Sequence, residues 1–539
     1  MKPTTVSLLT AAVLIAGCSK PQEAAPVAAP SAKPVAVQAA ASAAHAAGIA
    51  WKYAANDAEV DAAFAQAKAE TKPVFVYWGA KWCPPCNQVK ATLFNRQDFI
   101  ERSRAFVPVY VDGDSPGAQK LGSRFKVSGY PTMVLFSPQG TELTRLPGEV
   151  EAERYTQVLT LGMNAQRPVK EVLAQVKTDP KGLSANDWRL LAFYSWDTDQ
   201  QQLVPKDGVP ALLKQLADAC PADQGEIATR LRLKALAAVD EKAPAHPDAA
   251  AQATLLALLG DANGARVHLD MLTNYPGDIT RALSKAGTPQ RAELLKAFDV
   301  ALKRFEADTT LSRADRMQAL IAQVDLARID AKKDAAVKLP ETLLADIRAQ
   351  TARADSEITD GYERQAVITA AAYLLDEAGL GAESDTLLKA NLAKSHSPYY
   401  LMSELASNAK KRGDKVEALH WYQEAFDKSE GPATRLQWGS SLVNALVDLA
   451  PQDEARIEKA ASQLFTEAAK QPDAFYERSG RSLQRVGTKL QAWNKAGTHA
   501  AAIKRLQTQL DGLCGALDKG EPQHARCTAL LRPAAKAVA

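Results

Sequence analysis

Hydrophobic and polar positions between Ala50 and Met163 follow two alternating patterns. Four short runs are apolar or alternate with a period of two, which is typical of strands; they are residues 73–79, 105–112, 132–137 and 142–146. The stretches around these runs have apolar positions at helical spacing. We expect these helices at residues 56–70, from Cys83, at 117–125 and from Glu149. This alternation of strands and helices predicts one α/β domain over residues 49–165.

The strand pattern disappears beyond residue 165. The remaining residues are rich in Ala and Leu at helical spacing, and short clusters such as YPGD and KRGDKV interrupt them. Residues 166–539 are therefore predicted to form an all-helical domain of packed hairpins. Within it, GDKVEALHWYQEA (413–425) resembles the second helix of a tetratricopeptide repeat, and Gly379 lies one repeat period earlier. We expect a tetratricopeptide-like α-solenoid that presents a surface to a partner.

Length, composition and charge limit the classes of protein to consider. A chain of 539 residues is too long for one hydrophobic core, so several folding units are expected. With 46% hydrophobic and 24% charged residues, the composition is typical of folded domains. The 65 Lys and Arg against 62 Asp and Glu leave a net charge of +3, without a block of basic residues. Nucleic acid is therefore not an expected partner.

The N-terminus is typical of an exported lipoprotein. A short apolar run follows Lys2, with the length of a signal peptide and too short to span a bilayer. The sequence IAGC resembles the lipobox of bacterial lipoproteins, which implies removal of residues 1–17 and lipidation of Cys18. Ser19 after it implies the outer membrane of a Gram-negative cell and a periplasmic location. Cleavage at a nearby small residue, without a lipid, is the alternative. The Ala- and Pro-rich segment 18–48 is then a tether.

The strongest chemical motif is the pair Cys83 and Cys86 in AKWCPPC. A cysteine attacks a disulfide only as a thiolate, and Cys83 is predicted at a helix N-terminus, where the helix dipole lowers a thiol pKa. Cys86 follows one helical turn later on the same face, so it can attack a mixed disulfide from within the chain. We interpret Cys83 as the nucleophile and Cys86 as the resolving thiol.

This motif and a second one about 45 residues later, VSGYPTMVLF, resemble the thioredoxin-like family. The resemblance implies that Pro131 is cis and faces the cysteine pair, and that Trp82, Tyr130 and Thr132 contact substrate. ATLFNRQDF and SPQGTELTRLPG bring the domain closer to the reductase domain at the C-terminus of the DsbD transmembrane reductant carriers. The resemblance covers about residues 50–165 and implies nothing about the helical part.

The two prolines between the cysteines affect the strength of the nucleophile. Pro84 suits the first position of a helix, but Pro84 and Pro85 together remove two backbone donors beside the thiolate. We expect a milder lowering of the Cys83 pKa than in strongly oxidising relatives. A less stabilised thiolate favours a reducing potential, closer to the value of about −270 mV for thioredoxin than to about −120 mV for DsbA.

One position departs from the thioredoxin pattern. Thioredoxin has a buried aspartate six residues before its first active-site cysteine, where it helps to deprotonate the resolving thiol, whereas this chain has Tyr77. A neutral phenol does not readily take that proton. Asp112 and Asp114, in VDGD, are alternative acceptors.

Four other uses of the cysteine pair compete with redox chemistry. A structural zinc site needs four ligands, and residues 51–165 contain no histidine and no further cysteine. This absence also excludes a Cys/His nucleophile pair of the protease kind within the domain. Two thiolates can hold Cu(I), and a structural disulfide is the other alternative. No bound metal is expected.

The remaining cysteines are interpreted as structural. Cys514 and Cys527 flank a predicted turn between two helices, so a disulfide between them is expected, with two buried thiols as the alternative. Cys220 is left without a partner; we favour an inert thiol over a relay role.

These observations predict a periplasmic, lipid-anchored thiol:disulfide oxidoreductase that needs no cofactor besides its redox-active cysteine pair. It would reduce disulfides of a client protein, take electrons from a membrane or periplasmic thiol donor, and use the helical domain to bind a partner. The alternative is a helical interaction scaffold with a secondary redox or Cu(I)-binding motif.

Overall fold

The computed structural model describes residues 48–148, 151–165, 167–200, 202–240, 245, 248–332 and 337–532. The predicted signal peptide, the lipidated Cys18 and the tether up to residue 47 lie outside the described residues. Glu149, where a helix was expected to begin, also lies outside them.

Five strands form one mixed sheet in the order β1–β3–β2–β4–β5. β1 and β2 run parallel to β3, whereas β4 pairs antiparallel with β2 and with β5. Every residue of β2 is buried, as expected for a central strand covered on both faces. The strand β1 was not predicted, because two residues carry no periodicity. The strands are β1 Lys52–Tyr53, β2 Val74–Gly79, β3 Val107–Asp112, β4 Thr132–Phe136 and β5 Glu142–Leu146.

Five helices accompany the sheet, which confirms the predicted α/β thioredoxin-like fold. Helix α2 begins after Asn56, whose side chain accepts the backbone N–H of Glu59. Helix α3 continues into a π-helical turn at Lys90–Phe94, and the short α4 was not predicted. These helices are α2 Asp57–Glu70, α3 Pro84–Val89, α4 Gln97–Arg102, α5 Ala118–Phe125 and α6 Ala152–Met163.

The described residues after α6 form helices and short 3₁₀ turns, and none of them forms a strand, which confirms the predicted helical region. None of the helices within the described part of the chain is both long and apolar enough to cross a membrane. The helices are α7 Val169–Val176, α8 Ala185–Phe193, α9 Val209–Ala219, α10 Gly225–Ala237, α11 Ala249–Gly260, α12 Ala262–Val267, α13 Leu269–Asn274, α14 Pro276–Leu283, α15 Pro289–Ala307, α16 Arg313–Ala327, α17 Glu341–Glu357, α18 Gly361–Glu377, α19 Gly381–Asn391, α20 Pro398–Lys411, α21 Lys415–Lys428, α22 Pro432–Leu449, α23 Glu454–Ala469, α24 Glu477–Trp493, α25 Ala500–Gly515 and α26 Pro522–Ala529.

The glycines that suggested a repeat occupy equivalent turns. Gly379 lies between α18 and α19 with φ of +81°, and Gly413 lies between α20 and α21 with φ of +80°. Both conformations are left-handed, which favours glycine after the end of a helix. The spacing therefore identifies two successive helical hairpins, and their assignment to the tetratricopeptide family stays a prediction.

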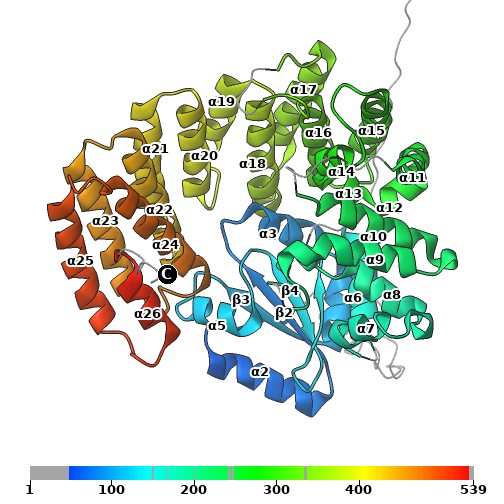
Figure 1. Cartoon of the computed structure of the whole chain (residues 1–539), viewed down its shortest axis with the longest axis horizontal. Coiled ribbons are helices and arrows are strands. Elements are labelled where there is room, and N and C mark those ends of the chain that lie inside the picture. Colours follow the sequence, from blue (N-terminus) through cyan, green and yellow to red (C-terminus); the bar gives the residue numbers. More distant parts are fainter. Residues whose placement is uncertain are drawn as a thin grey trace, which may run out of the picture. The chain divides into compact units, whose positions relative to one another are not determined.

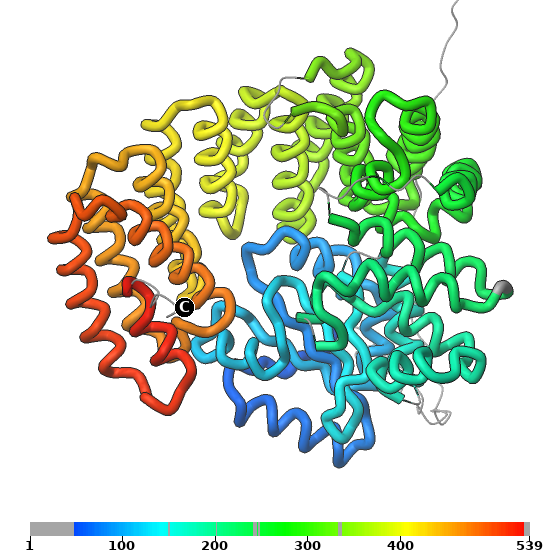
Figure 2. The backbone as a smooth tube through the Cα atoms, in the orientation of Figure 1, coloured from blue at the N-terminus to red at the C-terminus, as the bar shows by residue number. Residues whose placement is uncertain are grey.

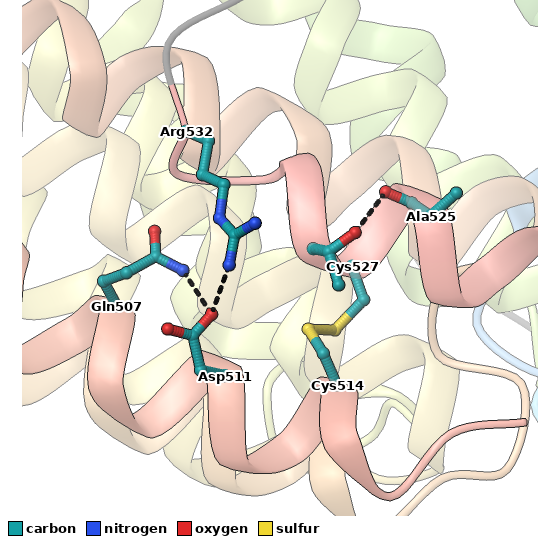
Figure 3. Close-up of a disulfide and its surroundings, with 7 residues drawn as sticks. Gln507, Asp511, Cys514, Ala525, Cys527 and Arg532 are labelled. Atoms are coloured by element: carbon teal, nitrogen blue, oxygen red, sulfur yellow. Dashed lines mark hydrogen bonds and ion pairs between the residues drawn. A yellow bond between two sulfur atoms is a disulfide. The ribbon is translucent and has the colours of Figure 1, made fainter. Parts of the chain in front are cut away.

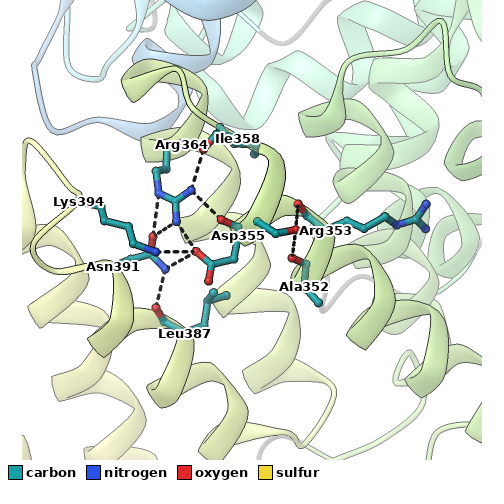
Figure 4. A network of polar contacts seen from close by, with 9 residues as sticks. Ala352, Arg353, Asp355, Ile358, Arg364, Leu387, Asn391 and Lys394 are labelled. Atoms are coloured by element: carbon teal, nitrogen blue, oxygen red, sulfur yellow. Dashed lines mark hydrogen bonds and ion pairs between the residues drawn. The ribbon is translucent and has the colours of Figure 1, made fainter.

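A polar network joins α17, α18 and α19 near the sheet domain (Figure 4). Arg364, in the first turn of α18, donates to the backbone carbonyls of Asp355 and Ile358 and to the side chain of Asn391. The Asn391 amide in turn donates to the Asp355 carboxylate at 3.0 Å. This network fixes the end of α18 that packs against α3.

The hydrophobic core continues across the predicted domain boundary at residue 165. One face of the sheet, which includes Phe75, shares a core with residues of α8 and α9 such as Trp188 and Leu216. The other face packs against α2 and α5. The described residues from Gly48 onward belong to one compact unit, and Figures 1 and 2 show helices of the C-terminal region beside the sheet domain.

Candidate active site

Cys83 and Cys86 lie at the start of α3. Cys83 is the N-cap residue, and its Sγ accepts the backbone N–H of Cys86 at 3.3 Å. Pro84 occupies the first helical position, where a missing N–H costs no hydrogen bond. The two sulfur atoms are 2.7 Å apart and belong to two unbonded thiols. Cys86 can therefore reach the Cys83 sulfur without a change in the backbone, as an internal resolving thiol must.

The loop before β4 borders the Cys83 sulfur. The Tyr130–Pro131 peptide bond is cis, and the Tyr130 carbonyl oxygen lies 3.6 Å from Cys83 Sγ. The Thr132 hydroxyl donates to the Gly129 carbonyl at 2.9 Å and is buried. Tyr130 and Pro131 are therefore brought to the reacting sulfur, whereas the side chain of Thr132 holds the loop.

Asn87 positions the cysteine loop and was not singled out in the sequence. Its side-chain amide donates to the carbonyls of Lys81 and Cys83, both at 2.8 Å, and the residue is fully buried. Asn87 thus ties the segment before Cys83 to α3. In the sequence, only the position of Asn87 directly after Cys86 indicates that it holds the cysteine loop.

Side chains of the helical region enclose Trp82. The Trp82 ring stacks on Tyr400 of α20 and contacts Trp438 of α22, with ring centroids 5.9 and 5.2 Å apart. The Arg478 guanidinium of α24 lies 4.9 Å from the Trp82 ring centroid, and Gln365 of α18 donates to the Trp82 carbonyl at 3.4 Å. We call Gln365, Tyr400, Trp438 and Arg478 the helical cover.

This helical cover buries the cysteine pair. Cys83 is 3% exposed and Cys86 is 0% exposed, and both share a core cluster with residues of α20, α22 and α24. Trp82, expected to contact substrate, instead contacts the chain's own helices and is 5% exposed. The helical region is therefore part of the surroundings of the cysteine pair.

Two aspartates cap helices across the contact between the sheet domain and the helical region. Asp114 accepts the backbone N–H of Thr434, in the first turn of α22, at 2.6 Å. Asp473, between α23 and α24, accepts the N–H of Gln119 in the first turn of α5 at 2.7 Å. A carboxylate at a helix N-terminus satisfies free donors and complements the dipole. Each region thus caps a helix of the other.

Burial under the cover changes the ionisation of the cysteines. Burial, together with the hydrogen bond to Cys86, raises the pKa of the Cys83 thiol well above its usual range, although the Cys86 N–H and the Arg478 guanidinium oppose this. For Cys86, burial opposes ionisation, but hydrogen bonds from its surroundings, first of all from Cys83, lower the pKa. The predicted lowering of the Cys83 pKa is therefore wrong. The helices that exclude water from the thiol are distant in sequence, so the cysteine motif alone does not reveal them.

The groups around Cys86 differ from those of thioredoxin. Burial raises the pKa of Tyr77 well above its usual range, so the phenol stays protonated. Asp114 is engaged with Thr434, and burial raises its pKa to about 6. Burial also raises the pKa of Asp112. Lys90, one turn after Cys86, interacts electrostatically with both Cys86 and Asp112. Its spacing from Cys86 was a signal that the sequence reasoning missed.

The other cysteines lie apart from this arrangement. Cys514 and Cys527 form a disulfide between α25 and α26, with their Cα atoms 5.6 Å apart (Figure 3). Cys220 is an unbonded thiol, and burial raises its pKa to about 11, which leaves it protonated at neutral pH. Among the described residues, no three His, Cys, Asp or Glu side chains are grouped closely enough to hold a metal ion.

The sheet domain is similar to domains of known proteins. A thioredoxin-like domain family matches residues 60–162. The thiol:disulfide interchange protein DsbD 1 of Pseudomonas aeruginosa is 29% identical over 106 residues, which are 19% of this chain and 18% of that protein. DsbD of Pseudomonas fluorescens is 30% identical over 112 residues, or 20% of this chain and 19% of that protein. DsbD of Yersinia pestis is 30% identical over 116 residues, or 21% and 19%. The chain thus matches less than a fifth of the length of each relative.

Proposed function

Because the chain carries a thioredoxin-like domain distantly related to DsbD, followed by a long helical region, we propose that it is a thiol:disulfide oxidoreductase acting through Cys83 and Cys86. The observation that carries this proposal is the pair of sulfur atoms 2.7 Å apart at the start of α3, beside cis-Pro131. A purely structural disulfide needs neither a helix N-terminus nor a bordering cis-proline loop.

The proposed reaction is a two-step exchange. The Cys83 thiolate attacks one sulfur of a client disulfide, the client S–S bond breaks, and the released client sulfur takes up a proton. Cys86 then loses its proton and attacks Cys83 Sγ, which releases the second client sulfur as a thiol. The client gains two electrons and the pair becomes a disulfide. A thiol donor returns the electrons by the reverse exchange.

The surroundings of Cys83 favour reduction over oxidation. Pro84 and Pro85 offer no backbone N–H to the thiolate, and burial raises the Cys83 pKa. Both effects leave the thiolate of the nucleophile Cys83 poorly stabilised in the reduced form, and a strong oxidant depends on a well stabilised one. The proposed net direction is therefore reduction of the client.

Lys90 is the proposed proton relay for the resolving step. It is half-buried beside the Tyr110 ring, 5.6 Å from the ring centroid, and interacts with both Cys86 and Asp112. Its positive charge favours the Cys86 thiolate, and Asp112, whose pKa is raised by burial, is suited to accept a proton.

The wider setting is also proposed on the strength of the sequence. The lipobox at Cys18 supports a lipid anchor at the periplasmic face of the outer membrane. The client is a disulfide-containing protein or smaller compound, and the donor is a thiol protein of the membrane or periplasm. The helical region, which contacts the cysteine pair directly, acts by controlling which partner reaches Cys83.

A stoichiometric trapping experiment tests the exchange. The reduced chain carries Cys220→Ser, which removes the third unbonded thiol of the described residues, and Cys18→Ser, which removes the cysteine of the predicted lipobox. It is mixed with a chromogenic aromatic disulfide. We expect two equivalents of coloured thiol from this protein, because Cys86 displaces the first adduct. Cys86→Ser should release one equivalent and keep a stable adduct on Cys83, whereas Cys83→Ser should give neither a stable adduct on residue 83 nor rapid release. Equal behaviour of the two single variants would contradict the proposed roles.

A further inference from the structure

A cavity of about 390 Å³ lies beside the cysteine pair, between the sheet domain and the helical region. Pro85 of α3, with Pro131 and Gly148 from two loops of the sheet domain, lines one side, and Met271 of α13 and Ala370 of α18 lie among the residues of the other side. None of the four residues of the helical cover lines it. The cysteine pair is thus sealed by the cover where Trp82 lies, and on the side of Pro131 it is separated from the cavity by Pro85 and Tyr130, which line the cavity although neither cysteine does.

The cavity ends at residues that touch the reacting sulfur. Tyr130 lines the cavity, and its carbonyl oxygen is 3.6 Å from Cys83 Sγ. Pro85, which also lines it, directly precedes Cys86 in α3. Tyr130 and Pro85 therefore form the wall between the cavity and the cysteine pair, and this wall must move for a molecule held in the cavity to bring its sulfur to Cys83.

The size of the cavity selects the class of substrate. Pockets of about 300 to 1,000 Å³ hold small molecules, whereas a folded protein partner requires about 800 Å² of surface on each side. The surface around Trp82 that such a protein would need is already occupied by the helical cover. The space that remains beside Cys83 therefore fits a small compound and not a folded domain.

The cavity wall carries charges of both signs. Arg230 and Asp270 both line it and form an ion pair at 2.6 Å. Lys234 also lines it, and its ammonium donates to the Tyr194 carbonyl at 2.8 Å. Amino-acid and peptide disulfides carry ammonium and carboxylate groups of both signs, like this wall, although Arg230 and Asp270 already pair with each other and must part to contact such a ligand.

We propose that the substrate admitted by this cavity is a low-molecular-weight disulfide of an amino-acid or short-peptide thiol. The inference rests on the proposed function and narrows it to a substrate class. Cys83 attacks one sulfur of the small disulfide, one thiol leaves, and Cys86 displaces the second. One small disulfide becomes two thiols, while the dithiol of the protein becomes the Cys83–Cys86 disulfide.

A single-turnover competition tests this inference. The full chain with Cys220→Ser is reduced, freed of reductant and mixed with glutathione disulfide or with insulin at equal disulfide concentration. Oxidation of the pair is followed by acid quenching, alkylation and mass measurement. Each rate is divided by the rate of dithiothreitol with the same disulfide, which removes the intrinsic reactivity of the two compounds. We expect the normalised rate to be about tenfold or more higher for glutathione disulfide.

Filling the cavity supplies the second part of the test. Ala370→Phe, and the milder Ala370→Leu, should slow the reaction with glutathione disulfide while leaving the equilibrium redox potential of the pair unchanged. Ala382→Phe, on the exposed surface of α19, is the matched control and should react at the rate of the parent protein. A thermal melt identifies any variant that has lost its fold.

The outcomes separate the two proposals. If insulin reacts as fast as glutathione disulfide, or if a folded Ala370→Phe variant reacts as fast as its parent, the small-substrate inference is wrong and the oxidoreductase proposal stands. If neither disulfide oxidises the pair, both proposals fall.

Discussion

The molecule contains two cysteine pairs that are equally buried and differ in everything else around them. Cys83 and Cys86 are 3% and 0% exposed, and Cys514 and Cys527 are 1% and 0% exposed. The first pair is two thiols at a helix N-terminus, beside a cis-proline and close to Arg478. The second is a disulfide that joins two helices at the end of the described chain (Figure 3).

The comparison shows that burial alone does not distinguish a reactive pair from a structural one. At Cys514 and Cys527 burial completes the packing of a helical hairpin. At Cys83 burial removes water from a thiol that the helix N-terminus would otherwise activate, and a cavity lies behind the neighbouring residues Pro85 and Tyr130. The reactive pair is therefore recognised by the hydrogen-bond donors, the charged side chains and the cavity near it. The helical cover limits the routes by which a substrate can reach Cys83.

The largest expected effect separates the two pairs by activity. In the Cys220→Ser background, Cys83→Ser should abolish rapid disulfide exchange, because Cys83 is the proposed site of the mixed disulfide, whereas the double variant Cys514→Ser/Cys527→Ser should keep the parental rate. Both rates are measured with glutathione disulfide in the same single-turnover assay. Loss of exchange in the Cys514→Ser/Cys527→Ser protein, while it remains folded, would mean that the second pair takes part in the chemistry.

The next effect concerns the helical cover. Trp82→Ala removes a buried ring that contacts Tyr400, Trp438 and Arg478. The free energy of unfolding should fall by about 4 kcal/mol, the usual cost of a buried Trp→Ala change. It is measured by denaturant titration, with Trp82→Phe as the control that keeps part of the packing. A loss below about 1 kcal/mol would show that the cover contributes little to stability.

Removing the second pair should affect stability and not reactivity. The disulfide closes a loop with a sequence separation of 13 residues. In the chain-entropy model a loop of this length stabilises the fold by about 3 kcal/mol. The same denaturant titration of Cys514→Ser/Cys527→Ser measures this difference. An unchanged midpoint would indicate that the last hairpin is held by its other contacts alone.

The smallest effect is a pH dependence of the contact that buries Cys83. Burial raises the pKa of Asp114 to about 6, above its value of about 3.9 in an unfolded chain. The folded state therefore binds this proton more tightly, and the carboxyl group disfavours folding increasingly as pH rises through 6. Between about pH 5 and pH 7 the loss should be about 1 kcal/mol.

Asp114→Asn provides the control for this pH dependence. The amide cannot ionise, and its oxygen can still accept the Thr434 N–H. Subtracting the stability of Asp114→Asn from that of the parent at each pH removes the contribution of other buried carboxyls such as Asp473. A difference that does not change between the two pH values would show that Asp114 is charged, or neutral, throughout.

The sequence predicted those features that depend on neighbouring residues. The central strands and the helix that begins at Cys83 follow from local periodicity and from the cysteine motif. The helical cover was not predictable in this way, because Gln365 and Trp82 are 283 residues apart and Asp114 and Thr434 are 320 residues apart. No local pattern encodes contacts at such separations.

The raised pKa of Cys83 was missed for the same reason. The motif itself shows which backbone donors lie near the thiolate, and Pro84 occupies the first helical position as predicted. The motif does not show that α18, α20, α22 and α24 exclude water from the thiol. Asn87, which holds the cysteine loop through two carbonyls, was missed because a single buried amide leaves no periodic pattern.

The equilibrium redox potential of Cys83 and Cys86 tests the central claim most directly. The full chain is equilibrated in thiol:disulfide buffers of defined ratio, and the fraction of the pair that is oxidised is read after alkylation. We predict a potential closer to the value of about −270 mV for thioredoxin than to about −120 mV for DsbA. A potential above about −180 mV, the value for protein disulfide isomerase, would contradict a reductase and make the pair an oxidant.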